Sequence, residues 1–231
     1  MIDIAPHADL RPAGQPDPIL FDLDGTLTES GPGVMASVRH ALELMGEQVP
    51  GDDVLRRFIG PPLADSFRDF CGMDADRVRV AIGAYREHYA EHGQYENSVY
   101  EGIPEVLETL SAAGRTLAVA TSKAQLFADG ILNHFGLAEH FALILGSEFD
   151  GSRTRKSDVL REVLARLGRP GREGVLIGDR YHDVFGATSV GMPCIGALWG
   201  YGSPEELTSA GATALAQHPS DVPAMVGVTS G

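Results

Sequence analysis

The sequence of 231 residues predicts an α/β fold in which helices cover both faces of a parallel sheet. From about residue 101 onward, short apolar runs of strand length alternate with segments of helix length. This alternation is typical of a parallel sheet with crossover helices. Residues 31–98 break the alternation, because they contain helical segments and no convincing strand. We therefore expect an all-helical insertion after the first strand.

The expected strands are uniformly apolar, as strands buried on both faces of a sheet are. The first is the run Ile19-Leu20-Phe21, which ends at Asp22. The others are expected at residues 116–120, 142–145, 174–177, 193–198 and, from a weaker run, 213–216.

Glycine and capping residues mark the ends of the expected helices. Outside the insertion they cover residues 104–113, 124–135 and 156–167, and a glycine follows each one. Ser203, Pro204 and Glu206 predict a further helix that begins with a capping box. Inside the insertion, helices are expected at residues 34–45, 63–70 and 76–92. Residues 1–17 contain three prolines and predict a disordered N-terminal arm.

The composition argues against several classes of protein. The chain has 18 basic and 32 acidic residues, a net charge of −14, which disfavours binding to nucleic acid or to an anionic membrane. No apolar run reaches the roughly 18 residues of a membrane-spanning helix. Cys71 and Cys194 form no CxxC pair, which argues against a zinc site. Two distant thiols and an N-terminus unlike a secretory signal predict a cytoplasmic protein.

Two carboxylates stand at the end of the first expected strand. Asp22 and Asp24 are two residues apart, so their side chains can face one point beyond the strand. Open parallel sheets bind ligands at this edge. Neighbouring carboxylates repel each other unless a cation lies between them or one is protonated. On these residues alone, a turn in which an aspartate caps the backbone is the favoured interpretation.

Three later segments carry further polar residues in similar places. Thr121-Ser122-Lys123 follows the second expected strand and opens a helix, where a hydroxyl and free amides suit a phosphate group. Lys156 closes a basic cluster at the start of another helix. Gly178-Asp179-Arg180-Tyr181-His182-Asp183 follows the strand at residues 174–177. The first two segments could also be a capped helix and a solvated loop.

Together, the string DxDGTL at residues 22–27 and the three later segments, in this order, resemble the haloacid dehalogenase-like hydrolases. This superfamily consists mostly of magnesium-dependent phosphatases, and the resemblance covers residues from about 18 to 210. The phosphoglycolate phosphatase-like branch, which has a helical cap, is the most similar. The resemblance implies a Rossmann-like core of residues 18–30 and 99–231 and a cap of residues 31–98. One departure is Ser157, because members usually have proline after the lysine.

The resemblance also implies roles for individual residues. Asp22 would be the nucleophile, and Asp24 would protonate the leaving group and then activate water. Mg²⁺ would bind Asp22, the backbone carbonyl of Asp24, Asp179 and Asp183, the last directly or through water. The remaining residues expected to bind substrate are Thr121, Ser122, Lys156 and Gly60. Arg39, Arg56 and Arg57 are candidates for meeting a second anionic group.

The expected activity is hydrolysis of a small phosphate monoester, such as phosphoglycolate or a nucleoside 5′-monophosphate. The expected partner is therefore a small phosphorylated metabolite. The alternative is phosphotransfer, either as a sugar phosphomutase or to and from protein tyrosine. A dehalogenase is excluded because those relatives lack the carboxylate that Asp24 supplies. A binding module without activity would have a broken motif, whereas all four are present here.

Overall fold

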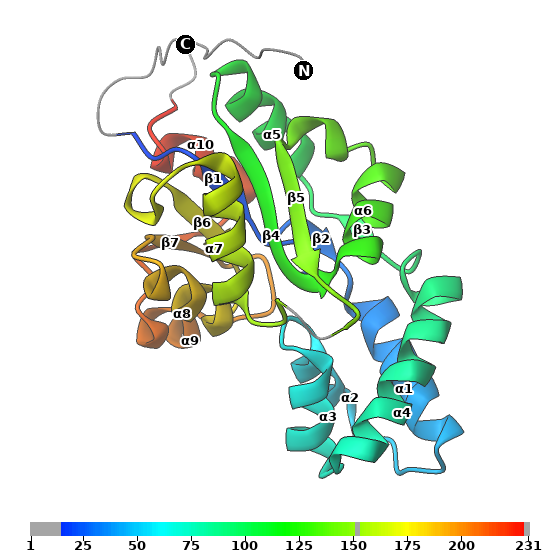
Figure 1. Cartoon of the computed structure of the whole chain (residues 1–231). Coiled ribbons are helices and arrows are strands. Elements are labelled where there is room, and N and C mark those ends of the chain that lie inside the picture. Colours follow the sequence, from blue (N-terminus) through cyan, green and yellow to red (C-terminus); the bar gives the residue numbers. More distant parts are fainter. Residues whose placement is uncertain (1–14, 151–152, 229–231) are drawn as a thin grey trace.

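A computed structural model of the chain describes residues 15–150 and 153–228, which form an α/β core and a helical cap (Figure 1). The core contains a six-stranded sheet in the order β5-β4-β1-β6-β7-β8, and every neighbouring pair is parallel. The strands are β1 (Ile19–Phe21), β4 (Leu117–Ala124), β5 (Leu143–Ser147), β6 (Val175–Gly178), β7 (Cys194–Ala197) and β8 (Ala214–Ala216). The expected fold class and all six expected strands are confirmed.

Helices cover both faces of this sheet because successive strand residues point to opposite sides. Ile19 and Phe21 pack with α5 (Ile103–Ala112), α6 (Gln125–His134) and α10 (Val222–Met225). Leu20 points the other way and packs with α7 (Lys156–Leu167), α8 (Tyr181–Ser189) and α9 (Pro204–Ala210). In Figure 1, α7, α8 and α9 lie together on one side of the sheet.

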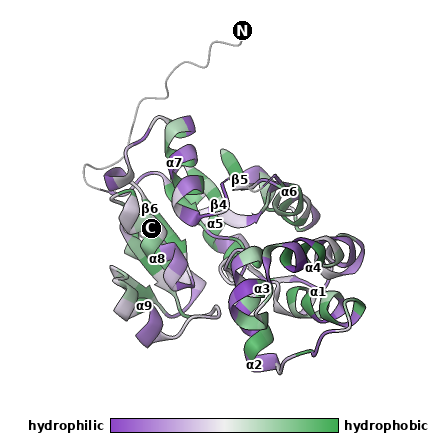
Figure 2. Ribbon diagram, turned by 60° about the horizontal axis from the view of Figure 1, so that its bottom comes forward, coloured by the Kyte–Doolittle hydropathy of each residue, from purple (hydrophilic) through white to green (hydrophobic). Residues whose placement is uncertain are grey.

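The cap is helical, as expected, and has its own hydrophobic core. It consists of α1 (Gly31–Leu44), α2 (Asp52–Leu55), α3 (Leu63–Cys71) and α4 (Ala75–His88). Hydrophobic and hydrophilic residues occupy different sides of α1 and α4 (Figure 2). A π-helical turn, Tyr89–Gly93, continues α4 and touches α1. A Cβ on Gly33 would lie only 1.9 Å from the carbonyl oxygen of Gly93, so this contact requires glycine.

A small antiparallel pair of strands, β2 (Thr28–Glu29) and β3 (Ser98–Val99), joins the cap to the core. The sequence did not predict this pair, because two residues are too few to show a strand periodicity. Both chain crossings between core and cap therefore run through one hydrogen-bonded ribbon.

Of the expected N-terminal arm, residues 1–14 lie outside the described residues. Residues 15–17 pack against the core instead of extending from it. Asp17 is buried, its backbone N–H donates to the carbonyl of Glu173 at 2.6 Å, and its Oδ1 accepts from the N–H of Thr116 at 2.8 Å. The side-chain amide of Gln15 donates to the carbonyl of Gly227 at 2.7 Å. Packing thus begins before residue 18.

Among the described residues, no helix combines the length and the apolar character needed to cross a membrane.

Candidate active site

Three aspartates from separate parts of the sequence meet at the carboxyl edge of the sheet. Asp22 follows β1, Asp179 follows β6, and Asp183 lies in the first turn of α8. Their carboxylate oxygens lie within 4.8 Å of one another, and all three residues are buried. Parallel strands end at the same edge, which is why the distant motifs converge there.

Glycine makes the close packing around Asp179 possible. Gly25, next to Asp24, has a φ of +83°, and a Cβ on it would lie 2.2 Å from Oδ2 of Asp179. That same oxygen accepts a hydrogen bond from the backbone N–H of Tyr201 at 2.8 Å. A side chain at position 25 would therefore displace the carboxylate.

Lys156 provides the positive charge of the cluster. Its Nζ lies 2.7 Å from Oδ1 of Asp22 and 2.7 Å from Oδ1 of Asp183. It also donates to the carbonyl of Ala120 at 2.8 Å. Burial lowers the pKa of Lys156, but the carboxylates of Asp183 and Asp22 outweigh this and hold the pKa above its ordinary value. The ammonium group is therefore charged throughout the physiological range.

One lysine does not neutralise three buried carboxylates. The pKa of Asp22 is raised to about 6, because burial and the charge of Asp183 raise it by more than Lys156 lowers it. Burial and the charges of Asp183 and Asp22 raise the pKa of Asp179 well above its ordinary value. Oxygen donors with excess negative charge suit a hard divalent cation such as Mg²⁺. The residues present therefore fit a divalent metal site.

The side chain of Asp24 points to a different partner. Lys123 lies 2.8 and 2.9 Å from the two carboxylate oxygens of Asp24, and its Nζ also lies 4.6 Å from the ring centre of Tyr89 in the cap. Both members of this pair are buried. Sequence reasoning missed Lys123 as a site residue. The sequence signal that could have indicated Lys123 as a site residue is its position two residues after Thr121.

The helix expected at residues 124–135 is confirmed, but Thr121-Ser122-Lys123 belongs to the strand before it and does not form the N-terminus of the helix. Strand β4 continues to Ala124, and α6 begins at Gln125. Thr121 is buried, and its hydroxyl accepts from the N–H of Lys123 at 3.2 Å. The pairing of β4 with β5 extends to Ala124 after a change of register, which keeps residues 121–124 extended. The Thr121 hydroxyl is present near the site, but the free amides of the helix lie further along the chain.

A cavity of about 420 Å³ lies between core and cap beside Asp24. Ser122 and Lys123 line it from the core, and Gly60 lines it from the cap, so two of the expected substrate-binding residues face this space. Its other walls are largely apolar and aromatic, among them Phe58, Tyr85, Tyr89, Phe127 and Phe149.

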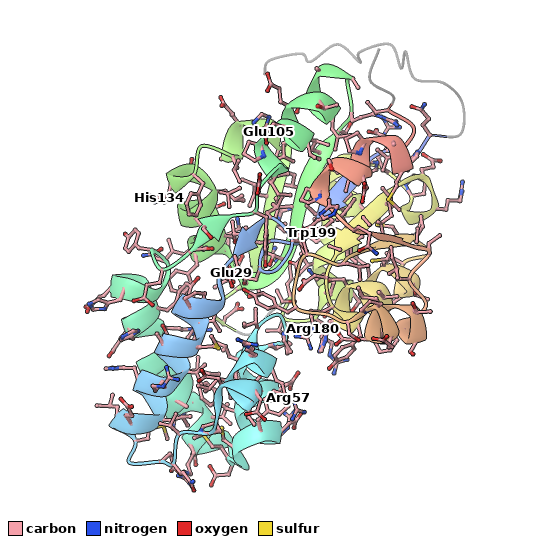
Figure 3. All side chains as sticks on the ribbon, turned by 180° about the vertical axis from the view of Figure 1, so that it is seen from behind. Glu29, Arg57, Glu105, His134, Arg180 and Trp199 are labelled. Atoms are coloured by element: carbon pink, nitrogen blue, oxygen red, sulfur yellow. The ribbon has the colours of Figure 1, made fainter. Side chains whose placement is uncertain are left out.

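The expected cations of the cap are not the ones that line this cavity. Arg39 pairs with Asp52 at 2.9 Å, and Arg57 lies over the ring of Phe70. Figure 3 shows Arg57 on the cap. Arg56 is exposed. Arg79 and Arg86 of α4 line the cavity instead.

Arg180 of the last motif links the core to the cap. Its Nε donates to Glu206 Oε1 at 2.9 Å, and its Nη1 donates to the carbonyl of Ile59 at 2.9 Å, next to Gly60 (Figure 3).

The expected capping box at Ser203 is only half formed. The N–H of Glu206 donates to the hydroxyl of Ser203 at 3.1 Å, but the Glu206 carboxylate accepts from Arg180 instead of returning to the cap residue.

Tyr201 links the aspartate cluster to the start of the cap. While its N–H donates to Asp179, its hydroxyl accepts from the N–H of Gly31 at 2.7 Å and donates to Glu29 Oε1 at 2.9 Å. Burial raises the pKa of Tyr201, so the phenol keeps the proton that it donates.

Comparison with known proteins agrees with this geometry. Residues 19–197 match the family described as haloacid dehalogenase-like hydrolase. The chain belongs to this family, and the resemblance expected from the motifs is confirmed.

Individual relatives cover most of the chain. It is 47% identical over 189 residues to a 5′-nucleotidase from Pseudomonas aeruginosa, a match that covers 82% of this chain and 86% of that protein. It is 42% identical over 204 residues to the tyrosine-protein kinase PtkA from Mycobacterium tuberculosis, covering 88% of this chain and 69% of the kinase. A predicted phosphatase from Clostridium acetobutylicum has a similar crystal structure, with a TM-score of 0.89, 40% identity and coverage of 92% and 98%.

Proposed function

We propose that the protein is a magnesium-dependent phosphatase that hydrolyses small phosphate monoesters through an aspartyl-phosphate on Asp22. The observation that carries the proposal is the buried cluster of Asp22, Asp179 and Asp183 with Lys156 among them. The relatives named as a 5′-nucleotidase and a predicted phosphatase support it.

The reaction has two steps, and each uses one carboxylate of the first motif. A carboxylate oxygen of Asp22 attacks phosphorus, the bond from phosphorus to the ester oxygen breaks, and Asp24 gives a proton to the departing alcohol. Asp24 then takes a proton from water, whose oxygen attacks the phosphoryl group on Asp22. This releases inorganic phosphate and restores the Asp22 carboxylate.

Charge neutralisation is the main requirement, because an anion attacks an anionic group. Lys156 and the Thr121 hydroxyl would hold phosphate oxygens, and Ser122 and Gly60 would contact substrate from the cavity wall. Asp22, Asp179, Asp183 and the backbone carbonyl of Asp24 would hold Mg²⁺. The ion would supply charge neutralisation and polarisation of the phosphoryl group. Preorganised charges of this kind account for most of the rate enhancement in many enzymes.

The test is phosphate release from a panel of phosphate monoesters, with Mg²⁺ and with EDTA. We expect release that requires Mg²⁺ and disappears in Asp22→Asn. Asp158→Asn is the matched control, since Asp158 is a partly exposed aspartate that pairs with Arg161 on α7. Release that persists in EDTA or in Asp22→Asn would refute the proposal.

A second candidate is phosphoryl transfer, either within a sugar phosphate or to protein tyrosine. The relative named as a tyrosine-protein kinase supports the second form. Hydrolysis in ¹⁸O-labelled water places the label in phosphate, whereas transfer places the phosphoryl group on an acceptor without label. The cavity of about 420 Å³ beside Asp24 suits a small molecule better than a protein side chain, which favours hydrolysis over transfer to protein tyrosine.

A further inference from the structure

The cavity beside Asp24 has a continuous aromatic wall. Tyr85 and Tyr89 of the cap stack with ring centres 5.4 Å apart, and Phe127 of the core contacts Tyr89 edge-on at 5.0 Å. Phe149 continues the wall, 5.8 Å from Phe127. The volume of about 420 Å³ falls in the range of about 300–1,000 Å³ that is typical of small-molecule sites. A glycolate group would fill only a small part of it.

The cation Arg86 belongs to this wall. The Arg86 guanidinium lies 4.4 Å from the ring centre of Phe149 and lines the same cavity as Asp24. Among the residues that the structure describes, no carboxylate pairs with it and no acceptor takes its hydrogen bonds. Burial also lowers the pKa of Arg86. Arg86 is half-buried, so water reaches its donors in the free protein, and a ligand in the cavity can replace that water with acceptors of its own.

The surroundings of Arg86 favour an uncharged acceptor over a second anion. Aromatic faces carry negative potential and would repel a carboxylate or phosphate held among them. The same faces stack well on a flat ring. A guanidinium presents its N–H donors in a planar fork, which matches two acceptors on the edge of a heterocycle.

We propose that Arg86 recognises the acceptor edge of a purine base in the leaving group, so that the enzyme prefers purine nucleotides with a ring carbonyl. Hypoxanthine and guanine present a carbonyl oxygen and a ring nitrogen on this edge, whereas adenine presents an amino donor in place of the carbonyl. This inference rests on the proposed function, and it names the substrate class of the same site.

The test compares inosine 5′-monophosphate (IMP) with adenosine 5′-monophosphate (AMP), because their bases differ at this edge. We expect kcat/KM to be about tenfold or more higher for IMP, in line with the discrimination of a bidentate arginine. In Arg86→Met the ratio of kcat/KM for IMP to kcat/KM for AMP should fall to about 1. The change should come mainly from a higher KM for IMP, because the contact is the same in the ground and transition states.

Arg79→Met is the matched control. Arg79 lies on the same helix and also lines the cavity, but it is largely exposed and pairs with Asp76 at 3.2 Å. This variant should keep the IMP preference. Equal kcat/KM for IMP and AMP in the unaltered protein, or a preference that survives Arg86→Met, would overturn the inference. A decrease in kcat/KM of Arg86→Met that is confined to substrates with a second phosphate group would also overturn the inference.

Binding separates this inference from the proposed function. Calorimetric titration of Asp22→Asn with IMP and with AMP needs no turnover, and we expect IMP to bind about tenfold more tightly. Equal dissociation constants would contradict the role of Arg86. Absence of phosphate release from every ester would contradict the proposed hydrolysis, and the binding ratio would still decide the role of Arg86.

Discussion

Replacing Lys156 by methionine should strongly destabilise the metal-free protein at high pH. The Lys156 side chain is 4% exposed, and those of Asp22 and Asp183 are 6% and 1% exposed. The substitution removes both 2.7 Å ion pairs and the hydrogen bond to Ala120. Removing one partner of a buried ion pair costs about 3–5 kcal/mol, a large part of a typical stability of about 5–15 kcal/mol.

The assay is urea unfolding in EDTA at pH 8 and at pH 5. Lys156 lowers the pKa of Asp22, so the Lys156→Met protein should take up protons more readily, and its loss of stability should be smaller at pH 5. Arg161→Met on the same helix removes an exposed pair with Asp158, worth about 0–1 kcal/mol, and is the control. A loss of stability in Lys156→Met no greater than that in Arg161→Met, or an equal loss at pH 5 and pH 8, would contradict this prediction.

Three other predictions follow from the same contacts. Because the folded-state pKa of Asp22 is raised from 3.8 to about 6, the metal-free protein should lose about 3 kcal/mol as pH rises through this window; Mg²⁺ should abolish this loss in unfolding experiments, and a stability that rises with pH would contradict it. Arg180→Met removes the hydrogen bond to Ile59 and should raise KM about fivefold, whereas Arg172→Met, at an exposed position, should leave KM unchanged. Gly33→Ala should cost about 1–3 kcal/mol because its Cβ would meet the carbonyl of Gly93; Gly83→Ala, with open space around it, should not destabilise.

The sequence was sufficient to predict the sheet and the convergence of the aspartates. Apolar runs of strand length, each followed by a motif, place Asp22 and Asp179 at one sheet edge, because parallel strands end together. The order of the motifs and the glycines after the helices are local signals. These signals agree with the observed structure because the tertiary fold has the same alternation of strand and helix.

Contacts between distant side chains could not be predicted in this way. Nothing in the local sequence pairs Lys123 with Asp24, or Arg180 with the carbonyl of Ile59. The cap brings Arg86 to Phe149 only once α4 packs against the core. The half-formed capping box at Ser203 has the same origin, because the Glu206 carboxylate meets a stronger partner in Arg180. Tertiary partners override local preferences at these positions.

In the proposed mechanism, Asp22 accepts the phosphoryl group, and Asp24 donates and accepts the protons. The most direct measurement is rapid mixing of Asp24→Asn with p-nitrophenyl phosphate and Mg²⁺. This leaving group needs no proton, so the first step should proceed and the second should stall. We predict a burst of one equivalent of p-nitrophenolate and the mass of one phosphoryl group on the peptide that contains Asp22. Release without a burst, together with an unmodified Asp22 peptide, would contradict the account.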